Sequence, residues 1–142
     1  MELNTFGALL KFALELEEAA ARFYEEAAKA ARDEALRSGL TARAESAKKN
    51  RQRLERVRRE QVNEMLLEPI EGLRESDYRA GGDAFPGAAD DDLTASAAEL
   101  EAACERFYRD AAERLSIPEV VRSFQGLADA HARNRAQLGG TQ

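Results

Sequence analysis

The feature that most restricts the fold of this chain is an internal repeat at an offset of 84 residues. Residues 13–28 read ALELEEAAARFYEEAA and residues 97–112 read AAELEAACERFYRDAA, with ten of the sixteen positions identical. The similarity continues weakly downstream, where Ala44, Asn50, Arg51 and Leu54 recur as Ala128, Asn134, Arg135 and Leu138. A helical pair that occurs twice and is joined by a longer connection predicts an all-α antiparallel four-helix bundle with one crossover.

Apolar residues recur every three or four positions along both copies, which is the period of an amphipathic helix. The spacing predicts helices over 3–30, 34–66, 91–115 and 118–138. Residues 67–90 contain two of the three prolines and four glycines, so we assign them to the crossover. The chain of 142 residues is then one domain, built from a hairpin over 3–66 and a second over 91–138.

Three polar residues mark expected helix starts. Asp33 is a good N-cap for the second helix, because its carboxylate can accept from a free backbone N–H. Ser116 and Glu119 have the spacing of a capping box before the fourth helix.

The composition excludes several classes of protein. Hydrophobic residues make up 44% and charged residues 34%, which argues against disorder, and no apolar run approaches the roughly 20 residues of a membrane span. Lys11 and Glu15 interrupt the apolar N-terminal stretch, so we expect a cytoplasmic protein. The lone Cys104 and lone His131 exclude a disulfide framework and any site that needs two histidines.

Charge is distributed unevenly along the chain. The net charge is −6, yet residues 43–59 hold eight Lys or Arg against Glu45 and Glu55, a local net of +6. The overall charge argues against nucleic-acid binding. The acidic start of the third helix could face the basic second helix of a neighbouring copy, so we expect a homo-oligomer, a dimer or higher. The basic second helix could also bind an acidic partner protein.

Two Glu–Tyr pairs with a spacing of seven residues lie at matching places in the repeat. They are Glu17 with Tyr24 and Glu101 with Tyr108. In this respect the chain resembles the ferritin-like superfamily, and its rubrerythrin branch most, whose first and third helices carry a metal-binding Glu seven residues before a Tyr. Residues 127–134 also resemble the fourth helix of rubrerythrins.

The resemblance implies a di-iron site built from one Glu on each of two helices and a Glu-x-x-His motif on each of the other two. Glu17 and Glu101 supply the single carboxylates. With Leu54 and Leu138 setting the register, the two motif positions instead read Ala47-x-x-Asn50 and His131-x-x-Asn134. A register that uses Glu45 and Asp129 is rejected, because Asp129 lies off the inward stripe and Lys48 follows Glu45 at the histidine position.

His131 therefore stands where the resemblance places a bridging carboxylate, and two interpretations remain open. It is a core histidine that hydrogen-bonds Glu17 or Glu101, or it joins both glutamates in a site for one iron, manganese or zinc ion. We expect no cofactor, with the metal ion as the alternative. In either case the side chains expected around the trio are Tyr24, Tyr108, Asn50 and Asn134.

The glutamates on the inward stripe need a compensating charge or proton. Without a cation they would repel each other, and glutamine at both positions would stabilise the protein at pH 8. Alternatively Arg51 or Arg135 pairs with them. We favour a degenerate ferritin-like protein that has lost the di-iron site and has a scaffold, partner-binding or small-ligand role. The alternatives are a metal-dependent oxidoreductase at Glu17, Glu101 and His131, and an adaptor for an acidic partner.

Overall fold

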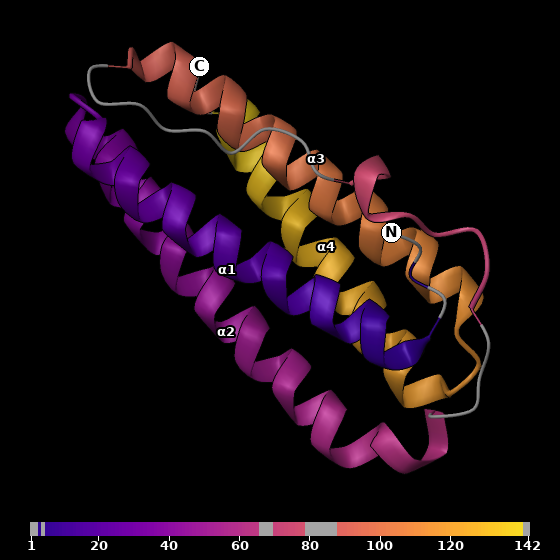
Figure 1. Cartoon of the computed structure of the whole chain (residues 1–142). Coiled ribbons are helices and arrows are strands. Elements are labelled where there is room, and N and C mark those ends of the chain that lie inside the picture. Colours follow the sequence, from indigo (N-terminus) through magenta and orange to yellow (C-terminus); the bar gives the residue numbers. More distant parts are fainter. Residues whose placement is uncertain (1–2, 4, 66–69, 79–87, 141–142) are drawn as a thin grey trace.

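The computed structural model describes residues 3, 5–65, 70–78 and 88–140. Within them the chain forms four helices and one short 3-10 turn: α1 (Phe6–Ala30), α2 (Glu34–Met65), η1 (Glu75–Asp77), α3 (Asp90–Arg114) and α4 (Pro118–Gly140). α1 packs along α2 and α3 packs along α4, so the molecule is two antiparallel hairpins laid against each other (Figure 1). The predicted all-α four-helix architecture is confirmed.

The helix ends follow local capping chemistry. Thr5 accepts a hydrogen bond from the N–H of Ala8, so α1 begins at residue 6 and not at 3. Asp33 caps α2 as predicted, since its carboxylate accepts from the N–H of Leu36 at 2.8 Å. The predicted Ser116 capping box is wrong: α4 begins at Pro118, and Ile117, not Ser116, immediately precedes it.

A carboxylate at the start of α3 joins the two hairpins at one end of the bundle. Asp90 accepts the backbone N–H groups of Arg32 and Asp33, both at 2.9 Å, in the turn between α1 and α2. These backbone hydrogen bonds lower the pKa of the Asp90 carboxyl, because they favour its charged form. The turn and the α3 N-terminus are thus held in one place.

The described part of the crossover is anchored to the bundle. Ile70, Leu73 and Tyr78 are buried, and the hydroxyl of Tyr78 donates to Asp110 at 2.7 Å. The Tyr78 ring meets Phe107 edge to face at 5.3 Å between centroids. The predicted crossover over 67–90 also includes residues 67–69 and 79–87, which lie outside the described residues.

The core consists of alanine, leucine and aromatic side chains, with five polar exceptions. The buried polar residues are Glu17, Arg43, Asn50, Glu101 and His131. Burying a Leu or Phe side chain contributes roughly 1.5–3 kcal/mol, whereas an isolated buried charge costs far more than that unless it is paired. These five residues therefore need an explanation from their contacts.

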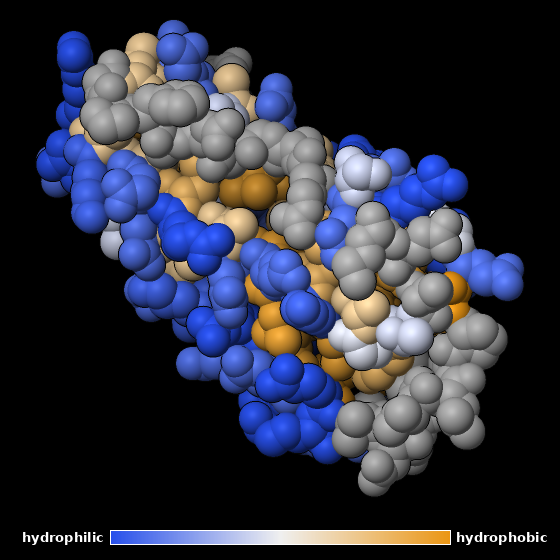
Figure 2. Space-filling view, viewed as in Figure 1, coloured by the Kyte–Doolittle hydropathy of each residue, from blue (hydrophilic) through white to orange (hydrophobic). Residues whose placement is uncertain are grey.

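The outer surface is mostly charged. In the view of Figure 2, hydrophilic side chains cover α1 and α2, and apolar groups gather along the middle of the face. In the part of the chain that the structure describes, no helix is both long and apolar enough to cross a membrane.

Candidate functional site

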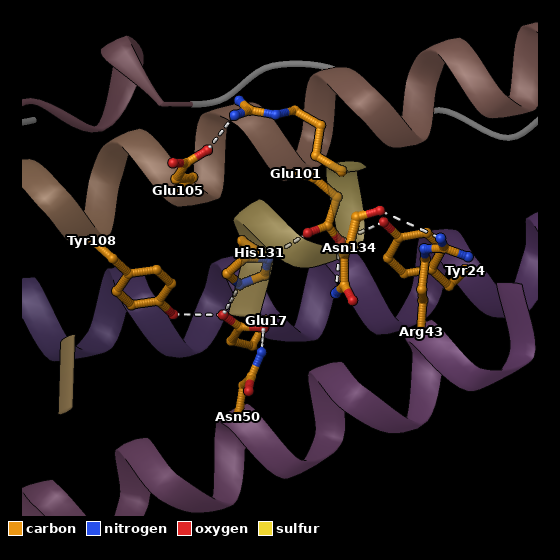
Figure 3. A network of polar contacts seen from close by, with 10 residues as sticks. Glu17, Tyr24, Arg43, Asn50, Glu101, Glu105, Tyr108, His131 and Asn134 are labelled. Atoms are coloured by element: carbon orange, nitrogen blue, oxygen red, sulfur yellow. Dashed lines mark hydrogen bonds and ion pairs between the residues drawn. The ribbon is translucent and has the colours of Figure 1, made fainter. Parts of the chain in front are cut away.

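The candidate site lies inside the bundle, where all four helices contribute one polar side chain or more (Figure 3). α1 supplies Glu17 and α3 supplies Glu101, at equivalent positions of the repeat. α4 supplies His131, whose ring lies between the two carboxylates. The structure therefore brings together the three residues that the sequence singled out, each at most 2% exposed.

Glu17 receives three hydrogen bonds. Its Oε1 accepts from Nδ2 of Asn50 at 3.2 Å, within the same hairpin. Its Oε2 accepts from the hydroxyl of Tyr108 at 2.6 Å and lies 2.9 Å from Nε2 of His131. A buried carboxylate that accepts several donors is stabilised in its ionised form.

Glu101 has the equivalent set of contacts. Its Oε1 accepts from the hydroxyl of Tyr24 at 2.6 Å and makes a long contact of 3.5 Å with Nδ2 of Asn134. Its Oε2 lies 2.7 Å from Nδ1 of His131. Each tyrosine thus reaches the glutamate of the other hairpin, while each asparagine bonds the glutamate of its own. The polar network joins the two hairpins.

The protonation of His131 follows from its two partners. An ionised carboxylate can only accept, so a ring that bonds one carboxylate at each nitrogen must carry a proton on both. Burial by itself lowers the pKa of His131, but Glu17 and Glu101 outweigh it and raise the pKa to about 10. The ring is therefore an imidazolium at neutral pH and supplies the positive charge of the site.

The tyrosines serve as neutral hydrogen-bond donors. Burial, followed by the charge and hydrogen bond of Glu101, raises the pKa of Tyr24 well above its usual value. Burial and the charge of Glu17 do the same for Tyr108. The ring of Tyr108 also stacks on His131, with 5.6 Å between centroids and an angle of 11°.

The repeat explains why one histidine is sufficient. The residue 84 positions before His131 is Ala47, which is also buried. Position 47 therefore supplies no polar group to the site. The single imidazole from α4 bonds both glutamates, one through each ring nitrogen.

Sequence reasoning missed Arg43. Its side chain is 8% exposed, and its repeat equivalent is the fully buried Leu127. A guanidinium nitrogen donates to the carbonyl of Asn134 at 3.4 Å, and the group lies beside Tyr24 and Asn134 in Figure 3. Arg43 is thus a second buried cation close to the site, although it forms no ion pair with Glu17 or Glu101 among the described contacts. The missed signal was spacing: Arg43 falls on the inward stripe of α2, three after Leu40 and four before Ala47.

Other expectations about neighbouring charges are corrected or supported. Arg51 pairs with Glu18 and Glu55, and Arg135 pairs with Glu105, so neither neutralises the central glutamates. The expectation of two carboxylates without a cation is also wrong, because the His131 imidazolium lies between them. Rejection of the alternative register is supported, since the Asp129 side chain is exposed and pairs with Arg109.

The lone cysteine lies close to the site but takes no part in the hydrogen-bond network described above. Cys104 is fully buried. Burial, together with the charges of Glu17 and Glu101, raises the pKa of its thiol. The group remains a protonated thiol and packs as a small apolar side chain.

The donor set does not fit the di-metal centre that the resemblance implies. Two iron ions need four carboxylates and two imidazoles, whereas this site has two carboxylates and one imidazole. A metal-bound histidine needs a free lone pair, and both ring nitrogens of His131 face carboxylate oxygens. Across the described ranges, no group of three or more His, Cys, Asp or Glu side chains is arranged to hold a metal ion.

Comparison with known proteins agrees with the fold. The four-helix bundle with a polar centre between two hairpins defines the chain as a ferritin-like protein, and the family profile of the ferritin-like domain matches residues 7–141. The chain belongs to that family. The solved structure of a hypothetical protein from Pyrococcus furiosus is similar in fold, with a TM-score of 0.71 and 24% identity over 94% of this chain and 85% of that one. No curated protein matches this chain.

Proposed function

We propose that this chain is a ferritin-like bundle that works without a metal, as a structural and partner-binding protein and not as an oxidase of iron. The single observation that supports this is the His131 ring between Glu17 and Glu101, with a carboxylate oxygen at each ring nitrogen. The imidazolium of His131, with one N–H toward each glutamate, occupies the space that a metal ion would need in order to bind both carboxylates.

The charges of the buried cluster support the same proposal. A buried carboxylate is stabilised by a paired positive charge in a low-dielectric interior. The His131 imidazolium supplies that charge between the two glutamates, and the buried Arg43 is a second cation that acts on the neighbouring Tyr24. The buried network of Glu17, His131 and Glu101 then has a structural role, because it holds the two hairpins together. Partner binding takes place on the surface of the bundle.

Metal content tests the proposal directly. After expression in medium supplemented with iron, manganese or zinc, we expect the purified protein to hold far less than about two metal ions per chain and to oxidise no iron(II). Elemental analysis and an iron(II) oxidation assay make the measurement. About two irons per chain with rapid oxidation would overturn the proposal. About one ion per chain, lost when His131 is replaced, would favour the mononuclear oxidoreductase.

A reconstructed site provides the positive control. The fourfold variant Ala47→Glu, Asn50→His, His131→Glu and Asn134→His restores a Glu-x-x-His motif on both helices. We expect this variant to take up metal under conditions in which the natural chain does not. That contrast would show that the donor set, and not the expression medium, limits metal binding.

A further inference from the structure

Five cations gather along the line where α2 and α4 run side by side. They are Lys49, Arg53 and Arg56 on α2, with Arg122 and Arg133 on α4, and we call this set the basic seam. Arg53 crosses from α2 to α4, where a Cβ added to Gly126 would lie only 2.7 Å from Nη2 of its guanidinium. The absence of a side chain at Gly126 allows Arg53 to lie across α4.

Helical spacing places the other four around this contact. Lys49 and Arg56 are four residues before and three after Arg53, so they continue the same stripe of α2. Arg122 and Arg133 are four before and seven after Gly126, on the same side of α4. Arg53 lies against Gly126 and Arg43 reaches the carbonyl of Asn134, so α2 and α4 run antiparallel. Counting along both helices from these contacts brings Arg56 level with Arg122 and Lys49 toward Arg133.

The seam cations form no ion pair, unlike two neighbouring cations on α2. Lys48, one position before Lys49, pairs with Glu25 and Glu45, and Arg51, two positions before Arg53, pairs with Glu18 and Glu55. Arg58 and Arg59, just beyond Arg56, are exposed and also form no ion pair among the described residues. No ion pair joins a seam residue to any carboxylate among the described residues.

The acids closest to the seam are either engaged or lie beyond its end. Glu45 is bound to Lys48, and Asp129 is bound to Arg109. Glu60 and Glu119 are exposed one turn past Arg56 and Arg122 and so bound one end of the seam. The seam thus carries five positive charges that form no ion pair among the described residues, on a chain whose net charge is −6.

We propose that the basic seam is a docking surface for an acidic polypeptide segment of a partner protein. This inference rests on the proposed function, because it names the surface through which a metal-free bundle would work. The α4 side of the seam carries Ser123, Gly126 and Ala130, whose side chains are small. Four of the five seam cations are exposed and therefore accessible to a segment lying along the two helices. Charge complementarity then selects carboxylates as the partner groups.

A polypeptide fits this surface better than a nucleic acid does. Single-stranded nucleic acids bind through aromatic side chains on which bases stack, and every tyrosine and phenylalanine of the described residues is buried. Duplex DNA presents a long row of phosphates, which the acidic remainder of the chain repels. Salt screens the interaction between charges over a distance of about 8 Å. A short acidic segment bound at the seam is therefore attracted by the seam cations and is little repelled by the acidic remainder of the chain.

The test measures binding of a fluorescently labelled oligoglutamate peptide by anisotropy. The variant Lys49→Glu, Arg56→Glu changes two exposed seam residues and lowers the charge by four. The control variant Lys11→Glu, Arg22→Glu makes the same change at two exposed positions on α1. We expect the seam variant to lose affinity about ten- to hundredfold and the control to change less than about threefold.

Three outcomes would overturn the inference. They are equal losses in both variants, no salt-dependent binding of oligoglutamate to the natural chain, and tighter binding of a DNA duplex or of phosphatidylserine vesicles than of the peptide. Thermal melting confirms that both variants fold. A negative result in the peptide-binding assay does not change the measured metal content of the protein. Failure of this inference is therefore distinguishable from failure of the metal-free proposal.

Discussion

Replacement of His131 by alanine is expected to lower the free energy of unfolding by about 3–5 kcal/mol at pH 8. The ring is 2% exposed and bonds a carboxylate at each nitrogen. Its removal leaves Glu17 and Glu101 buried with no cation between them, and a cavity remains where the imidazole was. Urea denaturation of both proteins measures the difference.

A combined variant separates the electrostatic cost from the cavity. Glu17→Gln and Glu101→Gln added to His131→Ala remove the uncompensated charges but keep the cavity. We expect this triple variant to recover at least about half of the stability lost by His131→Ala. In the natural background the same two glutamines remove both partners of the imidazolium, so they should destabilise the protein at pH 8. A triple variant no more stable than His131→Ala would contradict the ion-pair interpretation.

The natural protein should lose stability as the pH rises above neutrality. The pKa of His131 is 6.5 when unperturbed and about 10 in the folded protein. Above pH 6.5 the unfolded chain releases this proton while the folded chain retains it, so stability falls with pH until the folded pKa is passed. The total effect is on the order of 5 kcal/mol, with roughly 3 kcal/mol lost by pH 9. Denaturation series between pH 6.5 and 9 measure it.

The pH range and one control variant isolate His131 from other groups. Burial raises the pKa of Tyr24, Tyr108 and Cys104, and these groups reduce stability further only above about pH 9. His131→Gln keeps a hydrogen-bonding side chain that does not titrate, so its stability should stay flat between pH 6.5 and 9. A flat profile for the natural protein would show that His131 is neutral when folded.

The repeat alone was enough to predict the architecture. Two copies of one amphipathic pattern can bury their apolar faces only by packing against each other, and this explains why four helices and a crossover were predictable. The same repeat predicted the members of the site, because Glu17 and Tyr24 recur as Glu101 and Tyr108 on inward stripes. The helical period predicts which side chains face inward, and all four of these side chains are buried.

The tertiary structure decided which of the buried polar side chains contact each other. Periodicity does not state which inward side chains meet, and the sequence left His131, Arg51, Arg135, a metal or no cation as choices for the glutamates. The assembled bundle places one nitrogen of His131 within 2.9 Å of each glutamate. Each tyrosine crosses to the other hairpin, a pairing that depends on how the hairpins are laid together.

Arg43 also shows the difference between what the sequence predicts and what only the assembled bundle decides. It belongs to the basic run over residues 43–59, yet its position on the inward stripe buries it where the other repeat has leucine. Charge alone could not reveal this, because the free energy of a buried cation depends on the other charges that share its low-dielectric surroundings. Local pattern determines helices and faces through backbone geometry, whereas the balance of buried charge is a property of all four helices together and exists only once they are assembled.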